Sequence, residues 1–239
     1  MRKSLPIQIF AILLLLPFCG NGQNNSFQAL LKDNSYNHTT PLQSLHFQQI
    51  TQGKEYRHFY PNIKGHQYWN KSIYESGTLT FEGVTYREVL LNFDSYNNLV
   101  TTTVVQNGLS KNIILDNLKI DGFRINDHNF VNIRDSTNIL TPGIYILAFE
   151  GPSVQLFVNT QKKVVGNTGR PGEPLKKFAV EESNILLVDG KMHIVKNKKD
   201  VIEAFSERPQ LAAFIRSSKL RFKKNNEMTS SLLVILGEL

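Results

Sequence analysis

The pattern of hydrophobic and polar positions divides the chain into four parts. Residues 5–18 are almost entirely apolar, and residues 23–45 are rich in Asn, Gln, Ser, Thr and His with little periodicity. Across residues 46–165 short apolar runs alternate with turn residues, which is typical of half-buried β-strands. Residues 166–239 contain one further pair of alternating runs and then three stretches with helical spacing.

The central part predicts short strands joined by tight turns. Glu82-Gly83, Asn107-Gly108 and Asp189-Gly190 suit the positive φ angles that two-residue hairpins require. Connections this short indicate antiparallel neighbours, because parallel pairing needs a long crossover. The predicted strands are residues 78–81, 84–91, 99–105, 112–115, 122–125, 130–133, 143–149 and 154–158, followed by a hairpin of 184–188 and 191–195.

Helical spacing appears only near the end of the chain. Asn197 suits the N-cap of a first helix, Pro209 the first turn of a second, and Asn226 the N-cap of a third. The apolar stripes of these helices are Val201, Ile202 and Phe205, then Leu211, Phe214 and Ile215, then Met228, Leu232, Ile235 and Leu236. We therefore predict an α+β fold: an antiparallel β-meander, shaped as a curved sheet, sandwich or partial barrel, followed by a β-hairpin and two to three C-terminal helices.

The first apolar run predicts export. Arg2 and Lys3 precede it, and Gly20-Asn21-Gly22 supply small residues before a cut at Gln23, so residues 1–22 have the three parts of a signal peptide. The run is about 14 residues long, short of the ~20 that a membrane-spanning helix needs. After cleavage we expect a flexible lead-in (23–45), a β-rich domain (46–165) and a segment (166–239) that holds a Gly/Pro-rich linker, the hairpin and the helices, packed on the same core.

Cys19 is the only cysteine, and its fate decides the anchoring of the protein. Leu16 at position −3 fits lipidation of this cysteine, whereas the bulky Phe18 directly before it does not. Cleavage before Gln23 removes the thiol, which excludes a disulfide, a cysteine nucleophile and a cysteine-ligated metal from the mature chain. The expected location is the periplasm or cell envelope, with no transmembrane helix after cleavage and with lipid anchoring at Cys19 as the alternative.

Positive charge is concentrated in the last third of the chain. Residues 23–159 contain 10 Lys and Arg against 11 Asp and Glu, whereas residues 160–239 contain 15 against 9. The densest run predicts a basic surface for an acidic partner, with a solvated surface as the alternative. Its members are Arg216, Lys219, Arg221, Lys223 and Lys224. An exported address argues against nucleic acid as that partner.

Sequence motifs of common enzymes are missing. The chain has no His-Glu-x-x-His, no Gly-x-Ser-x-Gly, and its Gly166-x-x-Gly169-x-x-Gly172 pattern is interrupted by prolines where a phosphate cradle needs a helix N-terminus. We therefore predict no catalytic residue, no metal ligand and no cofactor. Four aromatic residues are candidates for stacking on an apolar ligand or a sugar ring, unless they only cover a face of the sheet. They are Tyr56, Tyr60, Tyr68 and Trp69.

Three segments carry a resemblance to a known group of proteins. Residues 62–69 (NIKGHQYW), 77–86 (GTLTFEGVTY) and 214–224 (FIRSSKLRFKK) resemble a family of uncharacterised exported proteins of Bacteroidetes bacteria. The resemblance extends from about Gly53 onward. It implies a periplasmic or cell-envelope location and a link to outer-membrane receptor systems, and it transfers no catalytic residue.

Two functions are compatible with these features. The leading hypothesis is a non-catalytic envelope protein that binds a protein partner or an apolar ligand through its sheet and docks through its C-terminal helices. The alternative is a hydrolase of envelope glycans or peptides, with acids such as Glu88, Asp94 or Asp121 brought together from distant strands.

The export hypothesis predicts the mature N-terminus. We expect the protein purified from its native source to begin near Gln23 and to lack Cys19, as intact-mass and N-terminal peptide mass spectrometry will show. A chain that still begins at Met1, or one that begins with a lipid-modified Cys19, contradicts this prediction.

Overall fold

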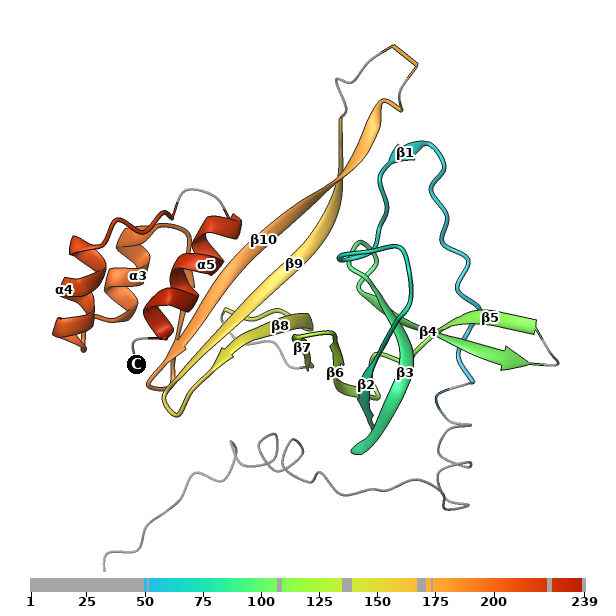
Figure 1. The fold of residues 1–239 in the computed structure, drawn as a ribbon, viewed down its shortest axis with the longest axis horizontal. Helices are drawn as coiled ribbons and strands as arrows, with labels where there is room; N and C mark the ends of the chain where they lie inside the picture. Colours follow the sequence, from blue (N-terminus) through green and yellow to red (C-terminus); the bar gives the residue numbers. More distant parts are fainter. Residues whose placement is uncertain are drawn as a thin grey trace, which may run out of the picture. The chain divides into compact units, whose positions relative to one another are not determined.

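The computed structural model describes most of the chain beyond the predicted signal peptide (1–22) and lead-in (23–45), which lie outside the described residues. The described residues are 50, 52–106, 109–134, 139–166, 171–172, 174–222 and 225–237. They form one large, mostly antiparallel open sheet and three helices near the C-terminus (Figure 1). The β-rich α+β prediction is confirmed at this level.

Most predicted runs coincide with strands or helices, but β9 and β10 extend well beyond the predicted 154–158 and 184–188, and β1 was not predicted. The strands are β1 (Ile63–Lys64), β2 (Glu75–Phe81), β3 (Val84–Asp94), β4 (Leu99–Gln106), β5 (Leu109–Ile114), β6 (Ile120–Ile125), β7 (His128–Ile133), β8 (Gly143–Glu150), β9 (Val154–Gly166), β10 (Lys176–Val188) and β11 (Lys191–Val195). The helices are α3 (Lys198–Ala204), α4 (Pro209–Ser217) and α5 (Asn225–Leu236). No helix in the described part of the chain is long and apolar enough to cross a membrane.

The strand order shows that the sheet is not one continuous meander. The order is β1-β10-β9-β8-β7-β6-β2-β3-β4-β5, with β11 also paired to β10. Strands β2 to β5 follow one another, but the chain then returns so that β6 pairs with the other edge of β2. The predicted meander is therefore wrong at this point, because two meanders are joined through β2 and β6. Every pairing is antiparallel except that of β1 with β10.

Two of the predicted hairpin turns have the expected backbone. Glu82 and Gly83 have φ angles of 49° and 76°, and Asp189 and Gly190 have 48° and 81°. Positive φ at both positions matches the right-handed twist of the flanking strands. The Asn107-Gly108 turn lies outside the described residues.

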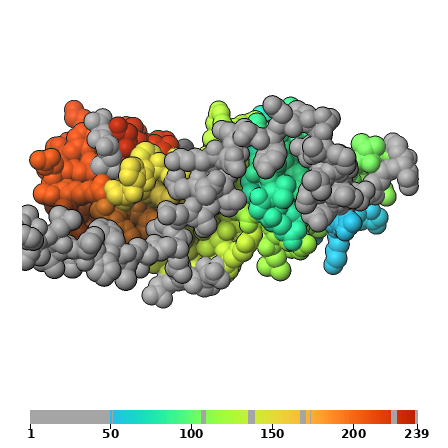
Figure 2. All heavy atoms as spheres, turned by 90° about the horizontal axis from the view of Figure 1, so that it is seen from below, coloured from blue at the N-terminus to red at the C-terminus, as the bar shows by residue number. Residues whose placement is uncertain are grey.

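The segment predicted to be a linker or long loop joins the two longest strands. β9 and β10 pair along their whole length, from Gly166↔Lys176 to Val154↔Val188. The boundary that we predicted between residues 165 and 166 therefore falls inside one hairpin. The space-filling view shows the orange and red C-terminal part beside the yellow β9 (Figure 2).

The helices add a layer to the core and do not stand apart from it. Asn197 caps α3 by accepting hydrogen bonds from the backbone N–H groups of Lys199 and Asp200, and Pro209 begins α4, as predicted. The predicted α5 stripe is fully buried and belongs to the same core as the strands: Met228, Leu232, Ile235 and Leu236. Phe214 was predicted to be buried but is 40% exposed, because Ala212 and Ile215 form the inner face of α4.

Burial of the α5 stripe predicts unequal effects of two neighbouring leucines. Leu232→Ala should lower the free energy of unfolding by about 2–5 kcal/mol, since Leu232 is 0% exposed and the substitution leaves a cavity. Leu233→Ala should change it by about 1 kcal/mol or less, since Leu233 is 40% exposed. Urea denaturation of both variants measures the difference, and equal effects would contradict the packing of α5.

Candidate functional site

The distal half of the β9–β10 hairpin extends beyond the last residue that pairs with β8. We call this part the arm: residues 159–166 of β9 and 176–183 of β10. β8 pairs with β9 only as far as Val158, so the arm has no β8 neighbour (Figure 1). Two large apolar side chains of the arm are exposed, Val165 (38%) and Val180 (53%), and Leu175, directly before β10, is 82% exposed.

A segment whose only strand is the two-residue β1 contacts β5, the arm and β3 in turn. We call residues 52–69 the strap. Its first part is bound to β5, where the Tyr56 N–H donates to the Asn112 carbonyl at 2.7 Å. Its last part follows β3, where the Trp69 N–H donates to the Phe93 carbonyl at 2.8 Å. Between these contacts, β1 pairs with Lys176 and Lys177 of the arm.

Asp94 at the end of β3 organises the strap and the β3–β4 turn. Asp94 is fully buried, with 0% exposure. Oδ1 accepts hydrogen bonds from the backbone N–H groups of Tyr96 (3.0 Å) and Asn97 (2.9 Å). Oδ2 accepts from Tyr56 Oη (2.7 Å) and Asn97 Nδ2 (2.6 Å). Four hydrogen bonds compensate the burial of this carboxylate, so its geometry is that of a structural anchor.

Lys162 fixes the arm to the same region. The residue is only 8% exposed, and its ammonium donates to the His66 carbonyl at 2.7 Å and lies 3.1 Å from His66 Nδ1. Its backbone N–H also donates to the Ser95 carbonyl at 3.2 Å. Burial lowers the pKa of Lys162 to about 8, an effect that the charge of Asp94 partly opposes.

The contact with Lys162 also defines the protonation state of His66. Because an ammonium only donates, Nδ1 must accept, and the neutral ring therefore carries its proton on Nε2. Burial lowers the pKa of His66, and the nearby Lys162 charge lowers it further. The neutral imidazole is thus the form that fits between the strap and the arm.

Two tyrosines of the strap complete the polar cluster around Asp94. The rings of Tyr56 and Tyr68 lie 6.1 Å apart, and Gln67 Nε2 donates to Tyr56 Oη at 2.9 Å. Burial raises the pKa of Tyr56, and the charge of Asp94 adds to this effect while the Gln67 hydrogen bond opposes it. Burial likewise raises the pKa of Tyr68. Both phenols therefore act as neutral hydrogen-bonding groups.

An aromatic contact joins the strap, the β3–β4 turn and the arm. Tyr60, Tyr96 and Phe178 pack edge to face, with ring centroids 5.2–5.6 Å apart. Tyr60 also shares hydrogen bonds of 3.1 and 3.3 Å with the Asn97 side chain. Edge-to-face pairs of this kind stabilise by about 0.5–1.5 kcal/mol beyond their buried area. Phe178 and Lys162 therefore hold the arm in addition to the β1 pairing.

The predicted ligand-binding aromatics are divided by the structure. Tyr56 and Tyr68 lie together in the polar cluster, and Tyr60 lies at the arm. Trp69 is separate from them, because its ring packs edge to face on His128 and Phe130 at 4.8 and 5.0 Å. The four residues therefore do not form one stacking platform.

The predicted basic surface follows α4. Arg216, Lys219 and Arg221 are exposed, and Phe222 anchors this stretch in the core at 7% exposure. Lys223 and Lys224 lie outside the described residues. Nothing in the described part of the chain neutralises the three exposed side chains, so this surface is solvated and basic.

The acids of the alternative hydrolase hypothesis have different partners. Asp94 is buried and bound as described above. Asp121 accepts from the Gly83 N–H at 2.8 Å and pairs with Arg134 at 2.6 Å, whereas Glu88 is exposed on β3. The two bound carboxylates share no hydrogen-bond partner, and within the described residues no cluster of three or more His, Cys, Asp or Glu could hold a metal ion.

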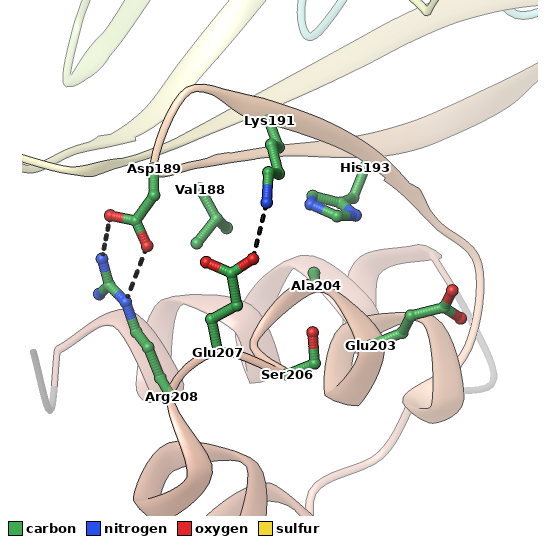
Figure 3. A pocket seen from close by; sticks show the side chains of 9 residues that line it. All are labelled: Val188, Asp189, Lys191, His193, Glu203, Ala204, Ser206, Glu207 and Arg208. Atoms are coloured by element: carbon green, nitrogen blue, oxygen red, sulfur yellow. Dashed lines mark hydrogen bonds and ion pairs between the residues drawn. The ribbon is translucent and has the colours of Figure 1, made fainter.

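A hollow of about 200 Å³ lies between the β10–β11 turn and helices α3 and α4. Two ion pairs cross it, Arg208–Asp189 at 2.7 Å and Lys191–Glu207 at 2.6 Å (Figure 3). Arg208 also donates to Ser153 Oγ at 2.7 Å. These charges neutralise one another, so the contacts fasten the turn to the helices and leave little charge for a ligand.

The sequence pattern did not single out Lys162, His66 or Gln67. A lysine, a histidine and a glutamine are ordinarily surface residues. One signal was present, because Val158, Thr160, Lys162 and Val164 continue the inward alternation of β9. Reading that alternation past Val158 would have placed Lys162 on the inner face of a longer strand.

The buried lysine predicts a pH dependence of stability. Folded Lys162 has a pKa of about 8, against 10.5 for an ordinary lysine, so the unfolded chain binds more protons between these pH values. The free energy of unfolding should therefore rise with pH in this window, by on the order of 1–2 kcal/mol after solvent screening.

Urea denaturation at several pH values between 8 and 10 tests this expectation in the wild type and two variants. Lys162→Met should abolish the rise, and Lys163→Met is the matched control because the Lys163 side chain is 55% exposed. A rise that persists in Lys162→Met would contradict the assignment.

Comparison of the chain with protein-family models, curated proteins and solved structures finds no match. Function is therefore inferred from the residues and the geometry of the chain itself, and the arm with its anchoring cluster is the candidate site.

Proposed function

We propose that this chain is an exported, non-catalytic protein of a bacterial cell envelope that binds a protein partner through the arm. The feature that carries this proposal is the exposure of apolar and basic side chains on a hairpin that is fastened to the strap. Val165, Leu175 and Val180 are exposed, and Lys176 and Lys177 are exposed beside them. By the β9–β10 register Val165 and Val180 lie on opposite faces of the hairpin, so both faces of the arm offer apolar surface to a partner.

Fastening the arm favours binding, because a surface already held in its bound shape loses little conformational entropy on association. Lys162, Phe178 and the β1 pairing hold the arm against the strap. The signal-peptide pattern and the resemblance to exported Bacteroidetes proteins support the envelope location, and a link to an outer-membrane receptor system belongs to this proposal.

The C-terminal helices are a less suitable docking element than the sequence suggested. The α5 stripe packs in the core, so a deletion of residues 197–239 would disrupt the fold together with any binding. The envelope hydrolase is not favoured by any specific contact, since Asp94 and Asp121 hold separate structural hydrogen bonds.

Site-specific crosslinking tests the proposal without disturbing the core. We expect a photoreactive phenylalanine analogue at Leu175, 82% exposed, to give a discrete crosslinked species in the envelope of the producing cells. The matched control is the same analogue at Leu118, which is 79% exposed in the β5–β6 connection and should give no such species. Mass spectrometry then identifies the captured protein.

Two outcomes contradict the proposal. The first is the absence of any species from position 175 at normal expression levels. The second is the same species from positions 175 and 118, because unspecific capture does not depend on the arm.

A further inference from the structure

One edge of the arm carries backbone groups that point away from the hairpin. The Lys162 N–H donates to the Ser95 carbonyl, so it points away from β10. In an antiparallel ladder, residues directly opposite each other either bond to one another or both point outward. Lys162 pairs with Val180, and the N–H and C=O of Val180 therefore point to the open side of β10.

The alternation of the ladder extends this result to the neighbouring residues. Phe178 and Glu182 lie two residues on either side of Val180 and therefore also point outward. Two other contacts agree with this phase. The Asp189 N–H donates to the Ser153 carbonyl next to β9 at 2.8 Å, so this odd-numbered residue points toward β9. Val188 pairs with Lys191 across the two-residue turn, so this even-numbered residue points toward β11 on the outer edge.

The open edge is short and has a neighbour at each end. β1 pairs with residues 176–177 of β10, and β11 pairs with residues 184–188. Residues 178–183 have no strand beside them on this edge within the described part of the chain. We call this stretch the edge slot. Six residues of strand span about 20 Å, which is room for one short extended segment.

The two bounding strands decide between the possible occupants. A second copy that offered its own β10 to this edge would bring its β1 and β11 along the same edge. They would meet the β11 and β1 of the first copy. A single extended segment with no flanking strands fits without displacing either neighbour.

Charge and apolar area indicate the composition of that segment. Lys176 and Lys177 are exposed at one end of the edge slot, and Lys196 is exposed just after β11 at the other. Val180, 53% exposed, and the half-buried Ala179 lie in the middle. An apolar centre with acidic residues on both sides complements this arrangement.

We propose that the edge slot binds an extended segment of a partner protein as an added β-strand, with apolar residues over Val180 and acidic residues against the terminal lysines. This rests on the proposed function, for which it names the binding mode. Backbone hydrogen bonds to Phe178, Val180 and Glu182 supply affinity, and the side-chain contacts supply selectivity.

The probe for this site is a displayed library of random twelve-residue peptides, selected against the purified full chain. Enriched peptides should alternate apolar residues and carry Asp or Glu toward their ends. Fluorescence polarisation with synthetic copies then gives affinities for the wild type and for three variants.

Val180→Pro removes an outward N–H and no hydrogen bond to β9, so we expect about tenfold weaker peptide binding. Val180→Thr keeps the N–H and is the matched control, with a change of about threefold or less. Replacing Lys176 and Lys177 together by Glu should weaken binding several-fold at low salt. Thermal unfolding checks that each variant is folded.

Amide hydrogen exchange tests the binding mode without any substitution. A bound peptide should slow exchange at Phe178, Val180 and Glu182, whose amides point into the edge slot. It should leave Ala179 and Glu181 unchanged, because these amides already bond to β9.

Several results overturn strand addition: no enriched peptide, equal affinity for Val180→Pro and wild type, or no alternating protection. Dimerisation that Val180→Pro abolishes assigns the edge to a second copy and also overturns it. If crosslinking from Leu175 persists in such a case, the arm binds its partner by another surface. If neither peptide binding at the edge slot nor crosslinking from Leu175 is found, the proposed function itself is wrong.

Discussion

The pairing of β9 with β10 is the constraint on which the rest of the structure depends. Both strands are 13 residues long and pair without a register shift. Near the core, β9 pairs with β8 and β10 pairs with β11, and these strands share one core with the helices. The distal halves of β9 and β10 form the arm. A slip of β10 by one residue relative to β9 would reverse the faces of β10, moving Phe178 away from the strap and Leu186 out of the core. One register therefore specifies the core and the candidate site together.

Lys162 shows that this arrangement is not chosen for stability alone. Burying an ammonium is unfavourable, and its two contacts with His66 offer only neutral acceptors. An apolar residue at the same inward position would pack against the strap without that penalty. What the lysine side chain adds is direction, because its hydrogen bond to the His66 carbonyl fixes the strap against the arm. That is the property that a binding hairpin needs.

Local sequence pattern predicted the turns and the helix caps. It did not predict which strands are neighbours or which distant side chains come together. Glu82-Gly83 and Asp189-Gly190 determine their turns within two residues, and Asn197 caps α3 through its own side chain, so these features were accessible from sequence. The return of β6 to β2 was not accessible, because alternation says which face a residue takes and not which strand lies beside it. The cluster of Asp94, Tyr56, His66 and Lys162 joins residues up to 106 positions apart, and no local spacing encodes it.

In β3 the alternation of buried and exposed residues shifts by one position part-way along the strand, which a strict period of two does not predict. In β3 the buried residues are Tyr86 and then Val89 and Leu91, which shifts the inward position by one. Two residues, Arg87 and Glu88, oppose one residue of β2 at this shift, and Glu88 has a φ angle of 57°. This is the geometry of a β-bulge, which bends a strand and increases its twist. Beyond the bulge β3 pairs with β4 and delivers Asp94 to the strap.

An open β-edge is normally a hazard, because it invites pairing with any other extended chain. Here the exposure is limited by length, since on this edge of β10 the described strands β1 and β11 leave residues 178–183 without a neighbour. Glu181 and Glu182 and the terminal lysines further disfavour apolar strands without matching charge. Burial raises the pKa of Glu182, so this carboxyl binds a proton more readily at mildly acidic pH than an exposed one. The short length and the charges of this edge prevent indiscriminate pairing. The same two features would make binding of an added strand selective, which supports the proposal of a binding site.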